Sequence, residues 1–311
     1  GSPVEMPWIN NVKGILEAYL GGQAVGGAEY DILFGKVNPS AKLPETFPKQ
    51  LEDNPSYLAG FGEGDHVEYR EGIFVGYRYY DKKKMDVLFP FGYGLSYTTF
   101  AYSNLRLDKK TMKDTEELTV SVDVTNTGDR AGKEVVQLYV ADKESTVIRP
   151  VKELRDFVKI ELAPGETKTV TFTLGKRAFA YYDVQIHDWQ VETGEFEILI
   201  GASSRDIALR DTVTVESTVK IPFHYTTDTT MGDIMSRPEA WKLVQSVLSK
   251  GMFGQGSEVN EGGDAAKEAI SDEMNAAMLQ YMPLRGPVSF GGGVSMADVQ
   301  KLVDRLNAME K

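Results

Sequence analysis

The chain has 311 residues, which corresponds to about two domains and is long enough to bury a substantial core. It carries 34 Lys and Arg residues against 46 Asp and Glu residues, a formal net charge of −12, so nucleic acid and anionic membranes are poor candidate partners. No apolar run approaches the ~18 residues that a membrane-spanning helix needs. The absence of cysteine excludes disulfides, thiolate metal sites and cysteine nucleophiles.

The chain starts at Gly1-Ser2-Pro3, which is neither a start site nor a signal peptide. We expect that something preceded Gly1, and the lack of a visible signal peptide slightly favours a cytoplasmic location. The three histidines, His66, His187 and His224, lie too far apart in the sequence to ligate a metal from one element. We therefore expect no metal site and no cofactor.

Residues 1–99 contain short helical patterns separated by turn signals. Apolar residues at helical spacing predict one helix over residues 11–20, ended by Gly21-Gly22, and a second over residues 24–34. Prolines and glycines recur from residue 41 to residue 65, which predicts loop-rich structure.

Residues 100–217 show a period of two, which is typical of half-buried strands. Turn sequences rich in glycine and proline separate the alternating runs, for example at residues 126–129 and 163–166. Some seven strands at this spacing predict an immunoglobulin-like β-sandwich. The apolar residues of the four clearest runs are Leu118, Val120, Val122 and Val124; Val136, Leu138 and Val140; Val170, Phe172 and Leu174; and Phe196, Ile198 and Ile200.

After Pro222 the period changes to that of helices. Three amphipathic helices are predicted, and a glycine-rich linker over residues 251–263 follows the first. Because an apolar stripe needs a surface to pack on, we expect this tail to dock on another part of the molecule. The three stripes are Trp241, Val244, Val247 and Leu248; Ala266, Ala269, Ile270, Met274, Ala277, Met278 and Tyr281; and Val299, Leu302, Val303 and Leu306, the last opened by a capping box of Ser295 and Asp298.

The sequence matches neither a phosphate-binding glycine motif nor the motif of a serine nucleophile. The glycine-rich segment at residues 21–27 matches neither known phosphate-binding pattern, so a helix cap and close-packing turn is the better interpretation. No Gly-x-Ser-x-Gly sequence is present, which together with the few histidines disfavours a Ser-His-Asp hydrolase.

Carboxylates and aromatic residues gather between residues 68 and 94. Glu68, Glu71 and Asp81 could line a sugar site, but pairing with Arg70 or Arg78 is the favoured interpretation. The aromatic clusters at residues 77–80 and 89–94 could form a carbohydrate platform or a buried corner between two domains. Packing is favoured there too.

The same residues carry a resemblance to a known family. Residues 72–81 and 88–98 resemble the end of the α/β-sandwich domain of glycoside hydrolase family 3, the β-glucosidase-like enzymes, and residues 1–8, 21–28 and 38–48 fit the same family in the same order. Residues 149–157 and 162–166 resemble its fibronectin type III-like domain. The resemblance covers about residues 1–217, and the helical tail is similar to extensions of some bacterial members.

The resemblance implies an α/β plus all-β protein made of a partial α/β sandwich, a fibronectin type III-like β-sandwich and a helical C-terminal extension. The expected boundaries are 1–99, 100–220 and 221–311. It also implies a retaining exo-glycosidase acting on terminal glucosyl or related residues, with an aspartate nucleophile and a glutamate acid/base. In the family both lie upstream of the part seen here, so no catalytic residue is assigned to this chain. Glu71 is not at the family's catalytic position.

The expected partners are an oligosaccharide or glycoside and the missing barrel and sandwich portion of the same enzyme, in the same or a separate chain. A homo-oligomer stays open. Because a sheet without its leading strands exposes edges and an apolar face, we expect residues 1–99 to fold stably only with that portion. The alternative function is a non-catalytic module that binds carbohydrate or protein.

Overall fold

The computed structural model describes residues 1–58, 64–251, 272–289 and 294–310. The chain divides into two compact units, Gly1–Val219 and Lys220–Lys311, and each is treated by itself below. None of the described helices has the length and hydropathy to cross a membrane.

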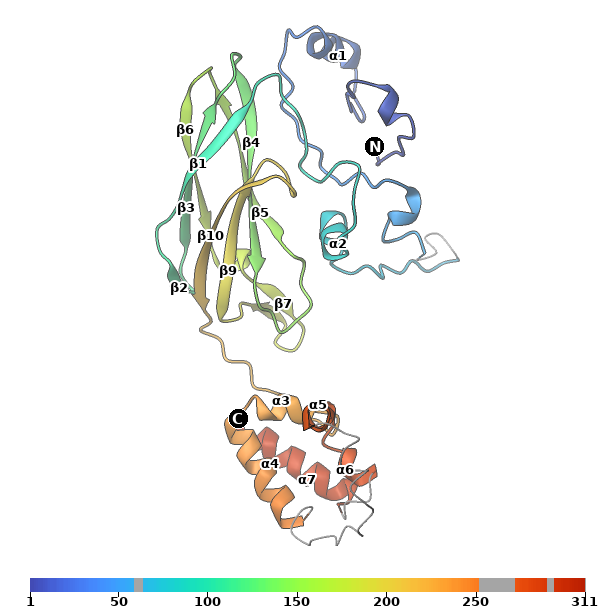
Figure 1. The fold of residues 1–311 in the computed structure, drawn as a ribbon, viewed down its shortest axis with the longest axis vertical. Helices are drawn as coiled ribbons and strands as arrows, with labels where there is room; N and C mark the ends of the chain where they lie inside the picture. The colour runs from blue at the N-terminus through green and yellow to red at the C-terminus, as the bar shows by residue number, and fades with distance from the viewer. Residues whose placement is uncertain (59–63, 252–271, 290–293, 311) are drawn as a thin grey trace. The chain divides into compact units, whose positions relative to one another are not determined.

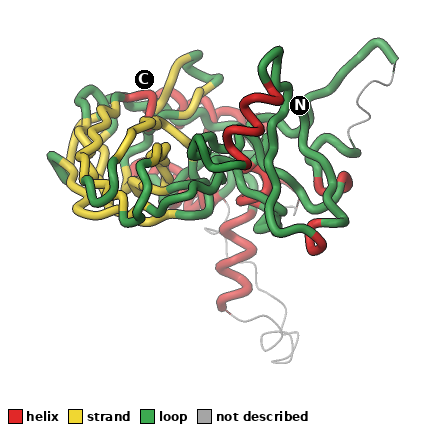
Figure 2. The backbone as a smooth tube through the Cα atoms, turned by 90° about the horizontal axis from the view of Figure 1, so that it is seen from above, coloured by secondary structure: helices red, strands yellow, loops and turns green. Residues whose placement is uncertain are grey.

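Residues 1–99 are mostly loops that carry a few short helices (Figure 2). Among their described residues the backbone forms no sheet, and one isolated bridge joins Phe47 to Phe89. The loop-rich prediction for residues 41–65 is confirmed over its described part. The helical segments are η1 (Ile9–Asn11), α1 (Val25–Leu33), η2 (Leu51–Asp53) and α2 (Tyr77–Lys82).

The predicted helix over residues 11–20 is wrong. This stretch is irregular, and Tyr19 has a positive φ of 47°, which a helix does not contain. Its apolar side chains Val12, Ile15 and Leu16 stay exposed. A short helix in water depends on packing of its apolar face, and these side chains find no surface that would supply it. The second prediction is confirmed, because α1 lies within residues 24–34.

Residues 100–216 form the predicted β-sandwich (Figure 1). One sheet has the order β1-β3-β6, the other has the order β2-β10-β9-β4-β5, and a separate hairpin joins β7 to β8. This fully described span therefore holds ten strands, more than the seven expected. They are β1 (Phe100–Leu107), β2 (Thr111–Lys113), β3 (Leu118–Asn126), β4 (Gly132–Asp142), β5 (Glu153–Leu162), β6 (Thr167–Leu174), β7 (Tyr181–Asp183), β8 (Asp188–Gln190), β9 (Gly194–Gly201) and β10 (Ile207–Glu216). A further short segment, η3, covers Lys176–Ala178.

The sandwich core comes from the alternating residues that the sequence singled out. Every second residue of β3 is buried, and the apolar positions of β4, β6 and β9 join the same cluster. Side chains that point to one face of a strand meet those of the facing sheet, so the two sheets bury each other. The turn at residues 163–166 is also formed, with Gly165 at a φ of +74° and a 3.0 Å bond from the Glu166 N–H to the Ala163 carbonyl.

The second unit is helical and has its own core. It contains α3 (Met231–Met235), α4 (Pro238–Gly251), α5 (Asp272–Tyr281), α6 (Gly286–Ser289) and α7 (Met296–Met309). The predicted capping box is present, since the Ser295 hydroxyl accepts the Asp298 N–H and the Asp298 carboxylate accepts the Ser295 N–H. Val244 of α4 and Leu302 of α7 belong to one buried cluster, so these two stripes pack together.

The predicted apolar stripe over residues 266–281 is described only in part. Ala266, Ala269 and Ile270 and most of the glycine-rich linker, residues 252–263, lie outside the described residues, and the side chains of Leu248 and Met274 are not described either. On α5, Met278 and Tyr281 are exposed and pack on no described core. The predicted helix is confirmed over its described part, because α5 covers Asp272–Tyr281. That the tail docks on another part of the molecule stays a prediction.

Candidate functional site

The aromatic-rich stretch of residues 77–94 packs on the β-sandwich. Tyr77 of α2 stacks on Phe91, with 4.8 Å between ring centroids, and meets Tyr139 of β4 edge-on at 6.0 Å. The backbone N–H of Leu154 in β5 donates to the Tyr77 hydroxyl at 2.8 Å. Burial raises the pKa of Tyr77. The packing interpretation is confirmed for this ring, which is not part of an open sugar platform.

A glycine makes room for a buried amide in the same contact. Gly92 has a φ of +79°, and a Cβ atom built on it would lie 2.2 Å from the Gln137 Oε1. The Gln137 Nε2 donates to the carbonyls of Gly92 at 3.1 Å and Ala202 at 2.7 Å, and its Oε1 accepts the Tyr139 hydroxyl at 2.6 Å. The buried amide is thereby satisfied on both sides, which avoids the cost of an unpaired polar group.

Of the three singled-out carboxylates, Asp81 has a structural role. It accepts from the Lys152 Nζ at 2.6 Å and from the Arg205 Nε at 3.0 Å, and its side chain is largely buried. Both cations come from loops of the sandwich, the one before β5 and the one after β9. Asp81 therefore ties α2 to the sandwich rather than facing an open sugar site.

Glu68 and Glu71 have different surroundings. Glu68 forms an exposed ion pair with Arg70, as expected. Arg78 pairs instead with Glu153 of β5, at 3.4 Å. The Oε2 atom of Glu71 is buried and has no hydrogen-bond partner among the described residues. Neither carboxylate is paired with the other, so the structure gives no two-carboxylate site here.

The proline-rich segment of residues 38–48 also holds the sandwich. Lys42 forms a buried ion pair with Glu134 of β4, at 3.0 Å, and donates to the Gly94 carbonyl at 2.9 Å. Glu134 also accepts the Tyr102 hydroxyl at 3.2 Å. Burial, together with the charge of Glu134, raises the pKa of Tyr102. Residues 38–48, which carry part of the family resemblance, therefore help to hold the two parts of the first unit together.

A buried arginine organises the loop between β4 and β5. Arg149 pairs with Asp142 at 2.9 Å and donates to the backbone carbonyls of Phe179 at 3.0 Å and Ala180 at 3.4 Å. Burial raises the pKa of Asp142, and the neighbouring Arg149 charge acts against that rise. A guanidinium with several fixed acceptors is a rigid anchor, so this loop is held in one conformation.

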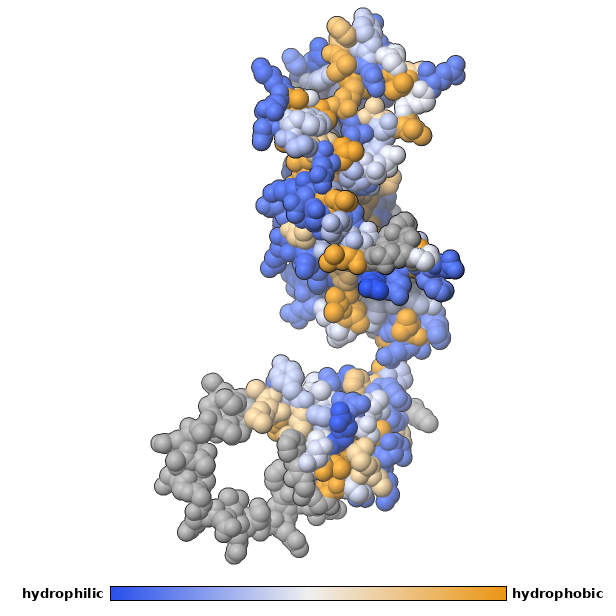
Figure 3. Space-filling model, turned by 90° about the vertical axis from the view of Figure 1, so that its right-hand side faces the viewer, coloured by the Kyte–Doolittle hydropathy of each residue, from blue (hydrophilic) through white to orange (hydrophobic). Residues whose placement is uncertain are grey.

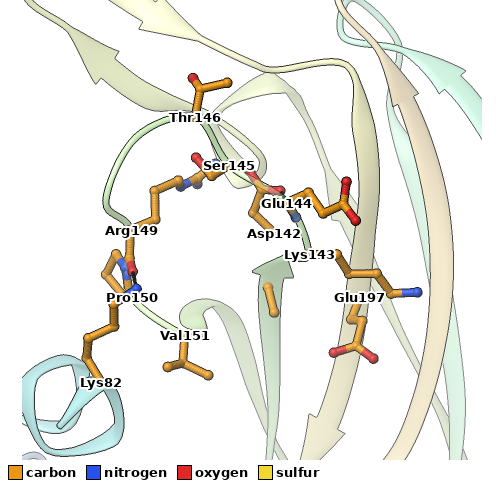
Figure 4. A pocket seen from close by; sticks show the side chains of 11 residues that line it. Lys82, Asp142, Lys143, Glu144, Ser145, Thr146, Arg149, Pro150, Val151 and Glu197 are labelled. Carbon is orange, nitrogen blue, oxygen red and sulfur yellow. Dashed lines mark hydrogen bonds and ion pairs between the residues drawn. The ribbon is translucent and has the colours of Figure 1, made fainter. Parts of the chain in front are cut away.

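An open hollow of about 870 Å³ lies beside Arg149 (Figure 4). The loop at residues 143–151 bounds it, and Lys82 of α2 and Glu197 of β9 lie on opposite sides of it (Figure 4). Its lining is mostly charged but also has apolar members. The lining residues are Lys82, Ala141, Asp142, Lys143, Glu144, Ser145, Thr146, Arg149, Pro150, Val151 and Glu197.

The remaining candidates form no site. His66, His187 and His224 are exposed, and no group of three or more His, Asp or Glu side chains suited to a metal occurs in the described part of the chain. The glycines at residues 21–27 do not end a helix before them, because none forms there. They turn the chain into α1 instead, with Gly22 at a φ of +65°.

Comparisons with known proteins identify the family of the chain. Residues 1–97 match the model of the glycosyl hydrolase family 3 C-terminal domain, and residues 134–204 match that of the fibronectin type III-like domain. The chain belongs to glycoside hydrolase family 3. It is 55% identical to thermostable beta-glucosidase B of Acetivibrio thermocellus over all 311 residues, which make up 40% of that relative.

Two further similar proteins match a smaller part of this chain. An exo-alpha-(1->6)-L-arabinopyranosidase of Bifidobacterium breve is 46% identical to this chain, and the match covers 80% of this chain and 32% of the relative's length. The solved family 3 beta-glucosidase of Bifidobacterium adolescentis is 44% identical, with a TM-score of 0.69 over 76% of this chain and 35% of its own. The chain thus spans about two fifths or less of the length of these relatives.

Sequence reasoning missed the polar residues that join the two parts of this family 3 chain. Gln137 stands inside the apolar run of β4, and Arg149 and Lys152 flank Pro150-Val151. A lone amide in a buried strand signals a specific partner, because an unpaired one would be costly. That signal identifies Gln137 as special but does not name Gly92, 45 residues away, as its partner.

Proposed function

We propose that this chain is the C-terminal portion of a retaining exo-β-glucosidase of bacterial origin, which removes terminal glucosyl or related residues from oligosaccharides or glycosides. The observation that carries the proposal is the 55% identity to a bacterial beta-glucosidase through all 311 residues, the helical extension included. The proposed boundaries are 1–99, 100–220 and 221–311, and the division between Val219 and Lys220 supports the second of them.

Retaining hydrolysis requires two carboxylates roughly 5–5.5 Å apart across the scissile bond, one as nucleophile and one as acid and then base. The surroundings of Asp81 and Glu68 favour structural roles, because each is bound to a cation of this chain. We therefore place both catalytic carboxylates in the barrel and sandwich portion that the longer relatives contain. In this proposal the chain contributes no catalytic, cofactor or metal-binding residue.

In this proposal the chain supports the barrel and sandwich portion of the enzyme by packing against it. Residues 1–99 contact the β-sandwich through Lys42 and Asp81, which pair with charged residues of the sandwich, and through the Gly92 carbonyl, which accepts from the buried Gln137 of β4. The rest of this segment exposes large apolar side chains, including Leu20, Phe34 and Leu58. Figure 3, which looks onto the side of the molecule that carries this segment, shows hydrophobic patches between polar ones. Such a surface is expected where a neighbouring part of the enzyme packs.

The test separates the chain from the complete enzyme. The pure 311-residue chain should hydrolyse no 4-nitrophenyl β-glucoside, whereas co-expression with the 60% of the Acetivibrio thermocellus relative that this chain does not match should give a stable complex with turnover. Turnover by the pure chain that is lost in Glu71→Gln would overturn the placement of the catalytic carboxylates. A co-expressed complex that forms but cleaves no glycoside would instead favour the non-catalytic binding module.

The sugar is tested on the active complex. A panel of 4-nitrophenyl β-glucoside, β-xyloside and α-L-arabinopyranoside should show the highest kcat/KM for the glucoside. The arabinopyranoside belongs in the panel because a relative with 46% identity is an arabinopyranosidase. A preference for it would keep the family but change the proposed substrate.

A further inference from the structure

The hollow beside Arg149 shares two residues with the contacts that join the two parts of the first unit. Lys82 donates to the Arg149 carbonyl at 2.9 Å, and Ala141 belongs to the buried cluster of Tyr77. At about 870 Å³ it is within the usual size of small-molecule sites, roughly 300–1,000 Å³. Its walls come from α2, from the loop between β4 and β5, and from β9. The recess is thus assembled from three separate segments of the chain.

The walls of the hollow are rigid. Arg149 fixes one end of the loop through Asp142 and two backbone carbonyls. Glu192 fixes the other end, because it accepts the Ser145 hydroxyl at 2.6 Å and the Thr146 N–H at 3.1 Å. A ligand would therefore meet preformed groups and would not have to order the loop.

Three charged groups around the hollow have unused hydrogen-bonding capacity. Glu144 and Glu197 make no side-chain hydrogen bond or ion pair with any described residue, so their oxygens are free acceptors. The Lys82 ammonium has three N–H donors, and one of them is used by Arg149. In Figure 4, Lys82 and Glu197 approach the hollow from opposite sides.

The charges of the lining balance. Lys82, Lys143 and Arg149 give three positive charges, and Asp142, Glu144 and Glu197 give three negative charges. A balanced lining has little attraction for a polyanion or a polycation. Apolar surface from Ala141, Pro150 and Val151 completes the lining, and Ala141 lies directly opposite Glu197 in the β4 and β9 pairing.

We propose that this hollow binds a neutral oligosaccharide. Sugar hydroxyls donate to the Glu144 and Glu197 carboxylates and accept from Lys82, while the C–H face of a ring contacts the exposed side chain of Val151. All the residues that would contact the saccharide belong to this chain. The proposal is independent of the catalytic assignment, because the pure chain is expected to bind without hydrolysing.

Calorimetric titration of the full 311-residue chain with cellotetraose and laminaritetraose tests it. Saturable binding to at least one of them is expected, with an affinity at least tenfold weaker in Glu197→Ala and in Lys82→Met. The matched control is Glu161→Ala, an exposed carboxylate on β5 outside the hollow, which should leave the affinity unchanged. Circular dichroism and the thermal midpoint identify any variant that fails to fold, and Glu144→Gln, on the exposed loop, supplies a milder substitution at the same site.

Trigalacturonate is the anionic comparison probe, and it should bind at least tenfold more weakly than the neutral sugars. Equal binding of this probe would overturn the neutral class of the ligand. Absence of binding of both neutral sugars, or binding that Glu197→Ala, Lys82→Met and Glu144→Gln all leave unchanged, would overturn the site. Backbone amide shifts confined to residues 141–151 and 197 on titration would support it.

Discussion

The β-sandwich and residues 1–99 belong to the same compact unit but bury their side chains in different ways. In β3 every second residue is buried, and the apolar faces of the two sheets bury each other. In α1 no residue is buried, although its composition is equally apolar. The first region closes its own core, whereas the second is held by a few side chains that lie against the sandwich, such as Tyr77. That such a segment folds stably only with a neighbouring portion stays a prediction.

The largest expected effect compares one phenylalanine in each region. Phe196→Ala should lower the free energy of unfolding by about 4 kcal/mol, because it leaves a cavity at a fully buried position between the sheets. Phe34→Ala should change it by less than about 0.5 kcal/mol, because that side chain is 71% exposed. Urea denaturation followed by circular dichroism measures both. Equal losses would mean that residues 1–99 hold a core of their own.

The second effect tests the contact between the regions. Gly92→Ala should cost about 3 kcal/mol, since the positive φ strains an alanine and its Cβ would overlap the Gln137 side chain. Limited proteolysis should then cut residues 1–99 sooner than the sandwich. Gly14→Ala is the matched control, because open space surrounds that position and its φ is not positive. Unchanged protection in Gly92→Ala would show that the segment is held elsewhere.

The third effect concerns the buried ion pair of Asp81. Asp81→Asn should cost about 2 kcal/mol, below the usual range for breaking a buried pair because Arg205 is partly exposed. A double-mutant cycle with Lys152→Met should return a coupling energy of about 1–2 kcal/mol. Glu68→Gln, in an exposed pair, should cost less than about 0.5 kcal/mol. A coupling energy near zero would remove Asp81 from the contact.

The smallest effect is a dependence on alkaline pH. Burial raises the pKa of Tyr80 to about 12, and burial also raises the pKa of Tyr139 in the sandwich. Tyrosine ionises near pH 10 in the unfolded chain, so the stabilisation is complete below pH 10 and is lost as the pH rises towards 12. Denaturation curves between pH 9 and pH 12 should show less loss in Tyr80→Phe than in the parent chain. Tyr182→Phe, at a half-exposed ring, is the control and should leave the loss unchanged.

Sequence patterns predicted the elements whose packing partner is another regular element. The alternation of Leu118 to Val124 specified a strand and its buried face, and Ser295 with Asp298 specified the start of α7. The same reasoning failed at residues 11–20, where apolar residues have helical spacing but the predicted helix does not form and the apolar side chains stay exposed. Periodicity shows which face would be buried and cannot show whether a surface is there to cover it.

Sequence by itself determined the sandwich, the helical tail and the family, because strand alternation, capping and the motifs of residues 72–98 are local signals. Only the tertiary structure decided what those motifs do. Lys42 pairs with Glu134, and Asp81 pairs with Lys152 and Arg205. Gly92 leaves space for the Gln137 side chain. In each case the partners lie dozens of residues apart in the sequence. Such pairs depend on which surfaces meet when the chain folds. The spacing of residues along the sequence does not predict which distant residues become neighbours. The hollow between Lys82 and Glu197 exists for the same reason.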